Sequence, residues 1–349
     1  MAGLDALLLT PGADLRYLTG YDAHALERLT CLVLPASGDP VLVVPALEEA
    51  AAKASPAGGL DLEILASPEG DDAYQVVRKV LGEPRRLALA DRMWAEQVLA
   101  FRAAFPGAEQ VLAGGVLRPL RVRKSSAEVE ALRRAAQAID RVHARMGEWL
   151  IPGRTEAAVG RDIADAIVAE GHARVAFVIV GSGPNGASPH HAVSERVIAD
   201  GDPVVVDIGG VTAEGYCSDS TRVYVTGTPP EGYATAYAVL QEAQEAGVAA
   251  VRPGVTAGSI DAACRDVLTA AGYGDAFIHR TGHGIGLEEH EEPWIIGGNE
   301  TVIEPGMAFS IEPGFYLAGR YGARIEDIVV CGPTGPDRLN QAPRTLTLL

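Results

Sequence analysis

The chain has 349 residues, which corresponds to about two domains when a domain averages roughly 150 residues. It carries 29 Lys and Arg against 46 Asp and Glu, a net charge of −17. Nucleic-acid phosphate would repel such a chain, so we expect no nucleic-acid partner. Hydrophobic residues make up 48% and charged residues 21%, as in ordinary globular proteins, which excludes a chain disordered throughout.

The distribution of cysteines and apolar residues limits the cellular compartment. The four cysteines are scattered singly with no C-x-x-C pair, which indicates neither a disulfide framework nor a thiolate zinc site. The first twenty residues contain Asp5 and no basic leader, unlike a secretory signal. No apolar stretch approaches the ~18 residues that a membrane span needs. We therefore expect a cytoplasmic protein with no membrane partner.

Short apolar runs in the first ~120 residues predict an α/β fold. Four runs predict strands, and Ala-rich, charged stretches between them predict helices. The runs are Ala6–Leu9, Leu32–Pro35, Val41–Val44 and Leu87–Ala90.

A basic segment, 121–124, precedes a long helical pattern that extends to about Leu150. Ser125 and Glu128 fit a capping box, in which the hydroxyl accepts from a backbone N–H and the carboxylate bonds back. A polar junction before a capped helix predicts a domain boundary near residue 122. We expect domains at 1–122 and 123–349.

The second part contains an internal repeat. Shifting the sequence by 101 residues places 151–155 on 252–256, and both copies read as a Pro-Gly turn, a Thr N-cap, an amphipathic helix and a glycine. Segments 204–209 and 218–225 likewise find counterparts in 308–314 and 324–330. The shared order predicts a duplicated α+β half-domain rather than a solenoid.

Each half contributes two carboxylates on strand-like segments: Asp207 and Asp219, then Glu312 and Glu326. A hairpin centred on Ala213 would place Asp207 opposite Asp219, with Cβ atoms about 5 Å apart. Four converging carboxylates repel one another unless cations compensate, and two divalent ions would balance their charge. The alternative is that each acid is merely a solvated strand end.

Histidines flanked by glycines add a nitrogen donor. His283 lies in Thr-Gly-His-Gly-Ile-Gly, and His290 follows seven residues later. The loop with His190 and His191 is a further candidate for the same site, although a lone histidine is more often structural. One histidine with four carboxylates suits Mn²⁺, and Co²⁺ and Zn²⁺ also fit.

One further motif is a weak match to a nucleotide site. The segment 181–186 reads G-x-G-x-x-G after an apolar run. A dinucleotide site requires a helix to begin at once, whereas Pro184 and a polar segment follow here. We therefore expect no NAD site.

In combination, the motifs resemble those of the pita-bread metallopeptidases, the family of prolidase, aminopeptidase P, methionine aminopeptidase and creatinase. They are Val-Asp-Ile-Gly-Gly, Ser-Asp-Ser-Thr-Arg, Gly-His-Gly-Ile-Gly, Ile-Glu-Pro-Gly and Arg-Ile-Glu-Asp. The resemblance covers the whole chain. It implies a creatinase-like N-terminal domain over 1–122 and a pita-bread catalytic domain over 123–349.

The resemblance also assigns roles to the candidate residues. Two metal ions would be ligated by Asp207, Asp219, His283, Glu312 and Glu326, with Asp219 and Glu326 bridging. Glu312 would carry a proton from the water nucleophile to the leaving nitrogen. His190 and His290 would contact substrate, with Arg324 beside the site.

One departure concerns the spacing of the first two ligands. Asp207 and Asp219 are twelve residues apart, where the family more often has eleven. Either a β-bulge or a longer turn holds the extra residue. We expect the turn to hold it.

The N-terminal domain and the Pro-His-His loop favour a peptidase for proline-containing di- or oligopeptides. Xaa-Pro dipeptidase (prolidase) is favoured, with aminopeptidase P and a non-catalytic peptide-binding module as alternatives. Retention of all five ligands argues against the module.

In a dipeptidase, Arg28 is a candidate to bind the substrate carboxylate at a neighbouring active site. The alternative is that Arg28 is a solvated surface side chain. The resemblance also implies a homodimer.

Overall fold

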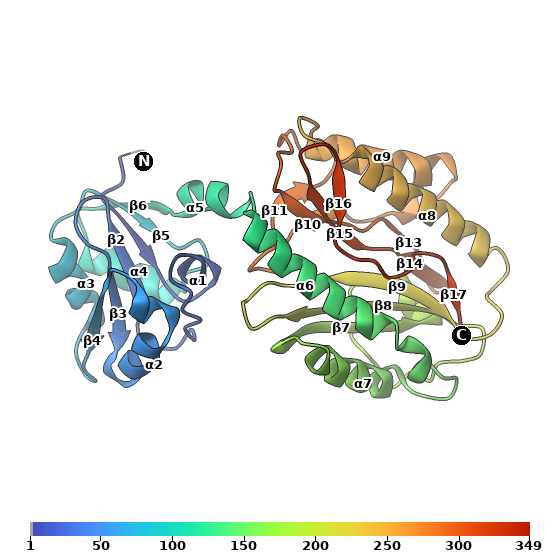
Figure 1. Cartoon of the computed structure of the whole chain (residues 1–349), viewed down its shortest axis with the longest axis horizontal. Coiled ribbons are helices and arrows are strands. Elements are labelled where there is room, and N and C mark those ends of the chain that lie inside the picture. The colour runs from blue at the N-terminus through green and yellow to red at the C-terminus, as the bar shows by residue number, and fades with distance from the viewer. Residues whose placement is uncertain (1–2) are drawn as a thin grey trace. The chain divides into compact units, whose positions relative to one another are not determined.

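The computed structural model describes residues 3–349, so Met1 and Ala2 of the expected N-terminal domain lie outside the described residues. The chain divides into two compact units, Met1–Arg121 and Val122–Leu349 (Figure 1). None of the described helices is long and apolar enough to cross a membrane.

The described part of the first unit is built on a six-stranded mixed sheet in the order β4-β3-β2-β1-β5-β6. The strands are β1 (Ala6–Leu9), β2 (Cys31–Pro35), β3 (Val41–Pro45), β4 (Glu63–Ser67), β5 (Arg86–Leu89) and β6 (Glu109–Leu112). The helices are α1 (Ala13–Thr19), α2 (Glu49–Ala54), α3 (Ala73–Leu81), α4 (Ala95–Ala104) and α5 (Gly114–Arg121). The four predicted strands and the α/β class are confirmed.

Both faces of this sheet are buried, because neighbouring residues of β1 enter different hydrophobic clusters. Leu8 packs in one cluster with Phe101 of α4. Leu7 and Leu9 pack in the other with Leu117 of α5. Strands that are buried on both faces consist of continuous apolar residues, which explains why these strands could be predicted from the sequence.

The described part of the second unit contains two larger sheets and a hairpin. One sheet has the order β17-β9-β8-β7, the other β11-β10-β12-β15-β16, and β13 pairs with β14. The first sheet and the hairpin comprise β7 (Arg174–Ser182), β8 (Pro203–Val211), β9 (Ser220–Val225), β17 (Thr347–Leu348), β13 (Gly314–Leu317) and β14 (Tyr321–Arg324). The second sheet comprises β10 (Gly282–Gly284), β11 (Glu291–Ile295), β12 (Ala308–Ile311), β15 (Asp327–Cys331) and β16 (Pro336–Arg338).

Helices cover these sheets (Figure 1). They are α6 (Ser126–His143), α7 (Glu156–Ala169), α8 (Tyr233–Ala250) and α9 (Ala257–Ala270). Ile139 of α6 and Ile163 of α7 share a core with Val206 of β8. Leu240 of α8 and Ile260 of α9 share another with Phe309 of β12. The sheets therefore lie between two helical layers.

Capping residues in the sequence correctly predicted where α6, α7 and α9 begin. Thr155 caps α7 by accepting from the Ala158 N–H, and Thr256 caps α9 by accepting from the Ser259 N–H. The capping box at the start of α6 is also present. The predicted end of α6 was wrong, because the helix stops at His143 and a short 3₁₀ turn follows. Beyond it, Trp149 and Leu150 turn into the α6–α7 core, where burial of their side chains outweighs another helical turn.

The predicted register of the β8–β9 hairpin was wrong. Asp207 lies opposite Thr221, not Asp219. Thr212 and Gly215 close the turn around Glu214, one residue later than expected. Gly215 has φ 96°, a left-handed conformation that favours glycine. Asp219 therefore lies two residues from the partner of Asp207, on the same face of the sheet.

The location of the extra residue between these two ligands was predicted correctly. The bridge between Val211 and Cys217 keeps the register of the β8–β9 pair. No bulge therefore interrupts this described hairpin, and its turn holds the extra residue. No α-helix begins directly after the G-x-G-x-x-G segment, as its sequence predicted. A five-residue 3₁₀ turn, Gly183–Ala187, follows β7 instead.

Candidate active site

The second unit contains a cavity of about 870 Å³ that collects eight of the nine predicted site residues. Phe177, Ile179, Ile278 and Ile296 add apolar wall. The predicted residues in its lining are His190, Asp207, Asp219, His283, His290, Glu312, Arg324 and Glu326.

The predicted ligands lie at corresponding places in the two sheets. Asp207 lies within β8, and Asp219 immediately precedes β9. Glu312 immediately follows β12, and Glu326 immediately precedes β15. Since β8–β9 and β12–β15 are both antiparallel pairs, each pair brings its two acids close to each other.

His283 occupies the middle of the short strand β10, between two glycines that have no room for a side chain. A Cβ at Gly282 would lie 1.9 Å from the Ser310 carbonyl oxygen, and one at Gly284 would lie 2.1 Å from the Glu292 carbonyl oxygen. The two glycines thus let the backbone of β10 approach its neighbours closely enough to hold His283 among the carboxylates.

Asp219, His283 and Glu326 form a buried cluster whose donor atoms all lie within 4.8 Å of one another. The Nε2 atom of His283 is 3.6 Å from Asp219 Oδ2 and 3.2 Å from Glu312 Oε1. The Ser310 hydroxyl also contacts this cluster. It accepts a hydrogen bond from the backbone N–H of His283 and donates one to Glu312 Oε1 at 3.0 Å. Carboxylate and imidazole donors at this spacing are a suitable ligand set for a divalent cation.

The electrostatics of the cluster favour a bound cation. Burial, followed by the charge of neighbouring carboxylates including Glu312 and Asp207, raises the pKa of Asp219 and of Glu326 well above their ordinary values. Burial opposes ionisation of Glu312 as well, but a hydrogen bond from His283 and its charge lower the pKa of that carboxyl to about 2. Ionised acids at this density need compensating positive charge.

Two buried carboxylate oxygens give independent support. Within residues 3–349, Asp207 Oδ1 and Glu326 Oε1 have no hydrogen-bond partner. Buried polar atoms are almost always paired, so both oxygens are available to a ligand. The donor set therefore fits the divalent ions that the sequence predicted.

Arg324 supplies one positive charge of the protein's own. It is 3% exposed, and its Nη2 donates to Asp207 Oδ2. Its Nη1 donates to the Tyr316 hydroxyl at 2.7 Å, and its Nε donates to Thr221 Oγ1 at 3.0 Å. Thr221 in turn donates to Glu326 Oε2 at 2.8 Å. This chain of contacts fixes the carboxylates of both halves relative to each other.

The predicted histidines occupy different surroundings. The ring of His290 lies 4.1 Å from that of His283, centroid to centroid. Loss of hydration, followed by the charges of His283 and Arg280, lowers the pKa of His290 to about 4, which keeps it neutral near pH 7. His190 lines the cavity, whereas His191 bonds Glu156 at 2.8 Å outside the cavity lining.

Sequence reasoning missed several residues of this site. Thr221 and Tyr316 contact Arg324, and His279 Nε2 lies 2.9 Å from the Tyr316 hydroxyl. His279 and Arg280 line the cavity and directly precede the glycine-flanked histidine motif, so their position in the chain was the available signal. Thr221 belongs to the motif Ser-Asp-Ser-Thr-Arg but was not singled out.

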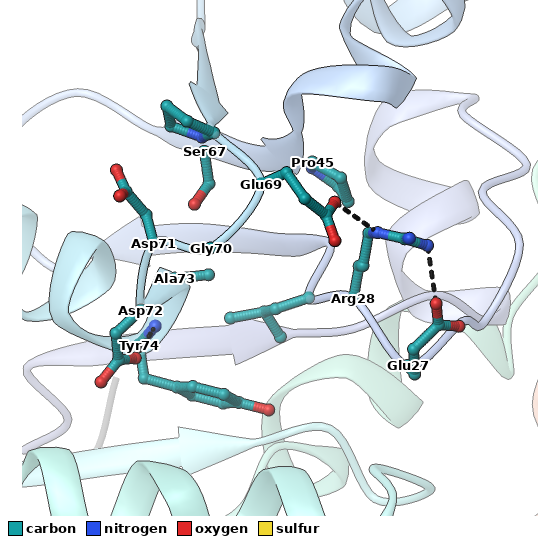
Figure 2. Close-up of a pocket in the computed structure, with 12 residues that line it drawn as sticks. Glu27, Arg28, Pro45, Ser67, Glu69, Gly70, Asp71, Asp72, Ala73 and Tyr74 are labelled. Atoms are coloured by element: carbon teal, nitrogen blue, oxygen red, sulfur yellow. Dashed lines mark hydrogen bonds and ion pairs between the residues drawn. The ribbon is translucent and has the colours of Figure 1, made fainter.

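Arg28 is the predicted residue that this cavity does not include. It lies in the first unit, beside a pocket of about 240 Å³. Its guanidinium pairs with Glu69 at 2.8 Å and with Glu27 at 2.6 Å (Figure 2). Within this unit its charge is balanced by two carboxylates.

Comparison with protein families assigns both parts of the chain. Residues 130–333 match the metallopeptidase family M24, and residues 1–123 match the creatinase/prolidase N-terminal domain.

Individual relatives agree with this assignment. The chain is 56% identical to a probable dipeptidase, PepE, of Mycobacterium tuberculosis, over 100% of this chain and 93% of the relative. It is 34% identical to an Xaa-Pro dipeptidase of Lactobacillus helveticus, over 95% and 91%. The solved prolidase of Thermococcus sibiricus superposes with a TM-score of 0.93 at 36% identity, over 99% of this chain and 95% of that one. The chain therefore belongs to metallopeptidase family M24, joins a creatinase/prolidase-type N-terminal domain to a pita-bread peptidase domain, and is a peptidase.

Proposed function

We propose that the protein is an Xaa-Pro dipeptidase that depends on two divalent metal ions, with Mn²⁺ favoured over Co²⁺ and Zn²⁺. The ligands would be Asp207, Asp219, His283, Glu312 and Glu326. The observation that carries the proposal is the convergence of these donors on one cavity, two of whose buried carboxylate oxygens have no hydrogen-bond partner within residues 3–349. When bound, such ions supply a polarised substrate carbonyl and a water of lowered pKa.

Glu312 is the proposed proton carrier. A carboxylate is ionised near pH 7, so it can accept a proton from the attacking water. It then returns that proton to the proline nitrogen as the peptide bond breaks. Its contacts with His283 and Ser310 hold the carboxylate in a fixed orientation for both steps.

His290 and His190 are the proposed substrate contacts. A neutral imidazole carries one N–H, and the low pKa of His290 keeps it in that form. An N–H directed at the scissile carbonyl would stabilise the negative oxygen that develops during attack. Both side chains line the cavity, so both are accessible to a bound peptide.

The proposal includes a cytoplasmic location and a homodimer. All four cysteines are unpaired and buried, as in proteins of a reducing compartment. The homodimer is inferred from the resemblance of the N-terminal domain to the creatinase type.

Hydrolysis of Leu-Pro tests the proposed function. We expect proline release with Mn²⁺ present, loss of release after chelation, and recovery when Mn²⁺ is restored. Glu312→Gln should reduce kcat by about 10²-fold or more, because the proton carrier is lost. Glu304→Gln is the matched control, since Glu304 is half-exposed and pairs with Arg123 outside the cavity lining. Undiminished activity in Glu312→Gln, or after complete chelation, would contradict the proposal.

A further inference from the structure

The cavity lining contains three guanidinium groups, and only two of them have a carboxylate partner. Arg324 pairs with Asp207. Arg265 forms two hydrogen bonds of 3.0 Å with the Asp261 carboxylate. Within residues 3–349, no carboxylate lies within ion-pair distance of Arg280. A positive charge without a carboxylate partner in a strongly acidic protein is available to an anionic ligand.

Arg280 is nevertheless held in place. Its guanidinium carbon lies 4.4 Å from the centroid of the Trp294 ring. The backbone supports this contact, because the N–H of Thr281 donates to the carbonyl of Ile295 at 2.9 Å. Stacking on an indole orients a guanidinium plane while leaving its charge and its N–H groups available.

The position of Arg280 suits the end of a short substrate. Arg280 lines the same cavity as the metal-ligand residues and as His290, whose ring centroid lies 4.1 Å from that of His283. Ile278 and Ile296 provide apolar surface in the same cavity. An apolar wall next to a stacked cation matches a proline residue with a free carboxylate.

We propose that Arg280, oriented by Trp294, binds the C-terminal carboxylate of a dipeptide and so makes the enzyme selective for dipeptides. This inference rests on the proposed Xaa-Pro peptidase function. In a dipeptide the carboxylate lies on the residue directly after the scissile bond, where a guanidinium can bind it in bidentate fashion. In a longer peptide the same position carries a neutral amide, and the pairing is lost.

Steady-state kinetics with matched substrates test Arg280. Leu-Pro and its amide, Leu-Pro-NH₂, differ only in the carboxylate. For Arg280→Gln we expect KM for Leu-Pro to rise by about 10- to 100-fold, with little change for the amide, since hydrogen bonds to a charged group are of this strength. Arg280→Lys keeps the charge without the planar fork and should lie between Arg280→Gln and the wild type.

Arg145→Gln is the matched control, because Arg145 also stacks on an indole, that of Trp149, but pairs with Glu148 and lies outside the cavity lining. We expect its KM for Leu-Pro to stay within about twofold of the wild type, as for most surface substitutions. A rise in KM for Leu-Pro in Arg28→Gln, with none in Arg280→Gln, would assign the carboxylate to Arg28 and overturn the inference.

Calorimetry of product binding separates this inference from the proposed function. L-proline and L-prolinamide are titrated into the Mn²⁺-loaded wild-type protein and Arg280→Gln. We expect the wild type to bind proline more tightly than prolinamide by about 10-fold or more, and Arg280→Gln to lose this preference. If the wild type hydrolyses neither Leu-Pro nor its amide, the proposed function fails while the titration still decides the role of Arg280. A preference for proline that persists in Arg280→Gln, or is absent in the wild type, overturns the inference.

Discussion

Arg324 and Asp207 form a buried ion pair although they are 117 positions apart and belong to different halves of the repeat. Asp207 lies in β8 of one sheet, and Arg324 ends β14 of the hairpin after β12. The pair brings a fixed positive charge to a cluster of four carboxylates. It therefore joins the two halves at the point where repulsion between them is strongest.

Replacing Arg324 by Met should destabilise the metal-free protein by about 3–5 kcal/mol, because Asp207 would remain buried without its cation. Denaturant unfolding of the second unit, followed after chelation, measures the change. Arg134→Ala is the control, since the Arg134–Glu214 pair is exposed on both sides and such pairs contribute about 0–1 kcal/mol. Equal effects of the two substitutions would show that the buried pair is no more important than an exposed one.

Replacing Asp219 by Asn should separate the stability of the metal-free protein from its response to metal. Ionised Asp219 is disfavoured without a cation, as its raised pKa indicates, so a neutral amide should leave metal-free stability unchanged or higher. The stabilisation by Mn²⁺, about 2.7 kcal/mol for the wild type at 100 times Kd, should largely disappear. Calorimetric Tm values with and without Mn²⁺ measure both effects. A variant that retains the full Mn²⁺-dependent rise in Tm would remove Asp219 from the ligand set.

Replacing Tyr316 by Phe should lower the free energy of unfolding by about 1–3 kcal/mol, because the substitution leaves buried partners of the hydroxyl unpaired. Those partners are Arg324 Nη1 at 2.7 Å and His279 Nε2 at 2.9 Å. Urea unfolding with and without Mn²⁺ measures the loss. Tyr17→Phe is the control, because the hydrogen bond of 3.3 Å that the Tyr17 hydroxyl donates to the Leu120 carbonyl is longer and exposed. A loss no larger than in the control would mean that Tyr316 does not hold Arg324.

His143 should make stability depend on acidic pH. Burial lowers the pKa of His143 to about 3, and the ring contacts the Tyr224 hydroxyl and the Ser220 carbonyl. An unfolded histidine titrates near pH 6.5, so between about pH 6.5 and 3 the unfolded state binds a proton that the folded state does not. Stability is complete above this range and falls by up to about 1.4 kcal/mol per pH unit below it.

Comparison with His143→Gln isolates this contribution. The variant lacks the imidazole, so the stability advantage of the wild type should shrink steadily as pH falls from 7 to 4. Urea unfolding at each pH gives the two profiles. Parallel profiles would show that His143 does not contribute to the acid sensitivity.

Sequence patterns predicted the features that depend on neighbouring residues. Continuous apolar runs predicted β1 and β3 because both faces of the sheet are buried, and hydroxyl N-caps predicted the starts of α7 and α9. Strands β4 and β6 were missed, since they begin with Glu63 and Glu109 and their central residues are only partly buried.

Features that depend on distant contacts could not be predicted. The register of β8–β9 follows from the left-handed Gly215, and a shift of one residue in the turn changes the partner of Asp207. His190 and His191 are adjacent in sequence, yet Glu156 of α7 binds only His191. Arg280 is distinctive only because no carboxylate within residues 3–349 pairs with it, which is a property of the folded chain.

The most direct test of the account is the kcat/KM of the Mn²⁺-loaded protein for Leu-Pro, Leu-Ala and Leu-Pro-Gly, measured side by side. Leu-Ala tests the requirement for proline, and Leu-Pro-Gly tests the requirement for a free carboxylate next to the scissile bond. We predict that Leu-Pro exceeds both of the others by about tenfold or more, the effect of one charged hydrogen bond or one well-filled apolar subsite. Faster cleavage of Leu-Pro-Gly would indicate an aminopeptidase P, and equal cleavage of Leu-Ala would contradict selectivity for proline.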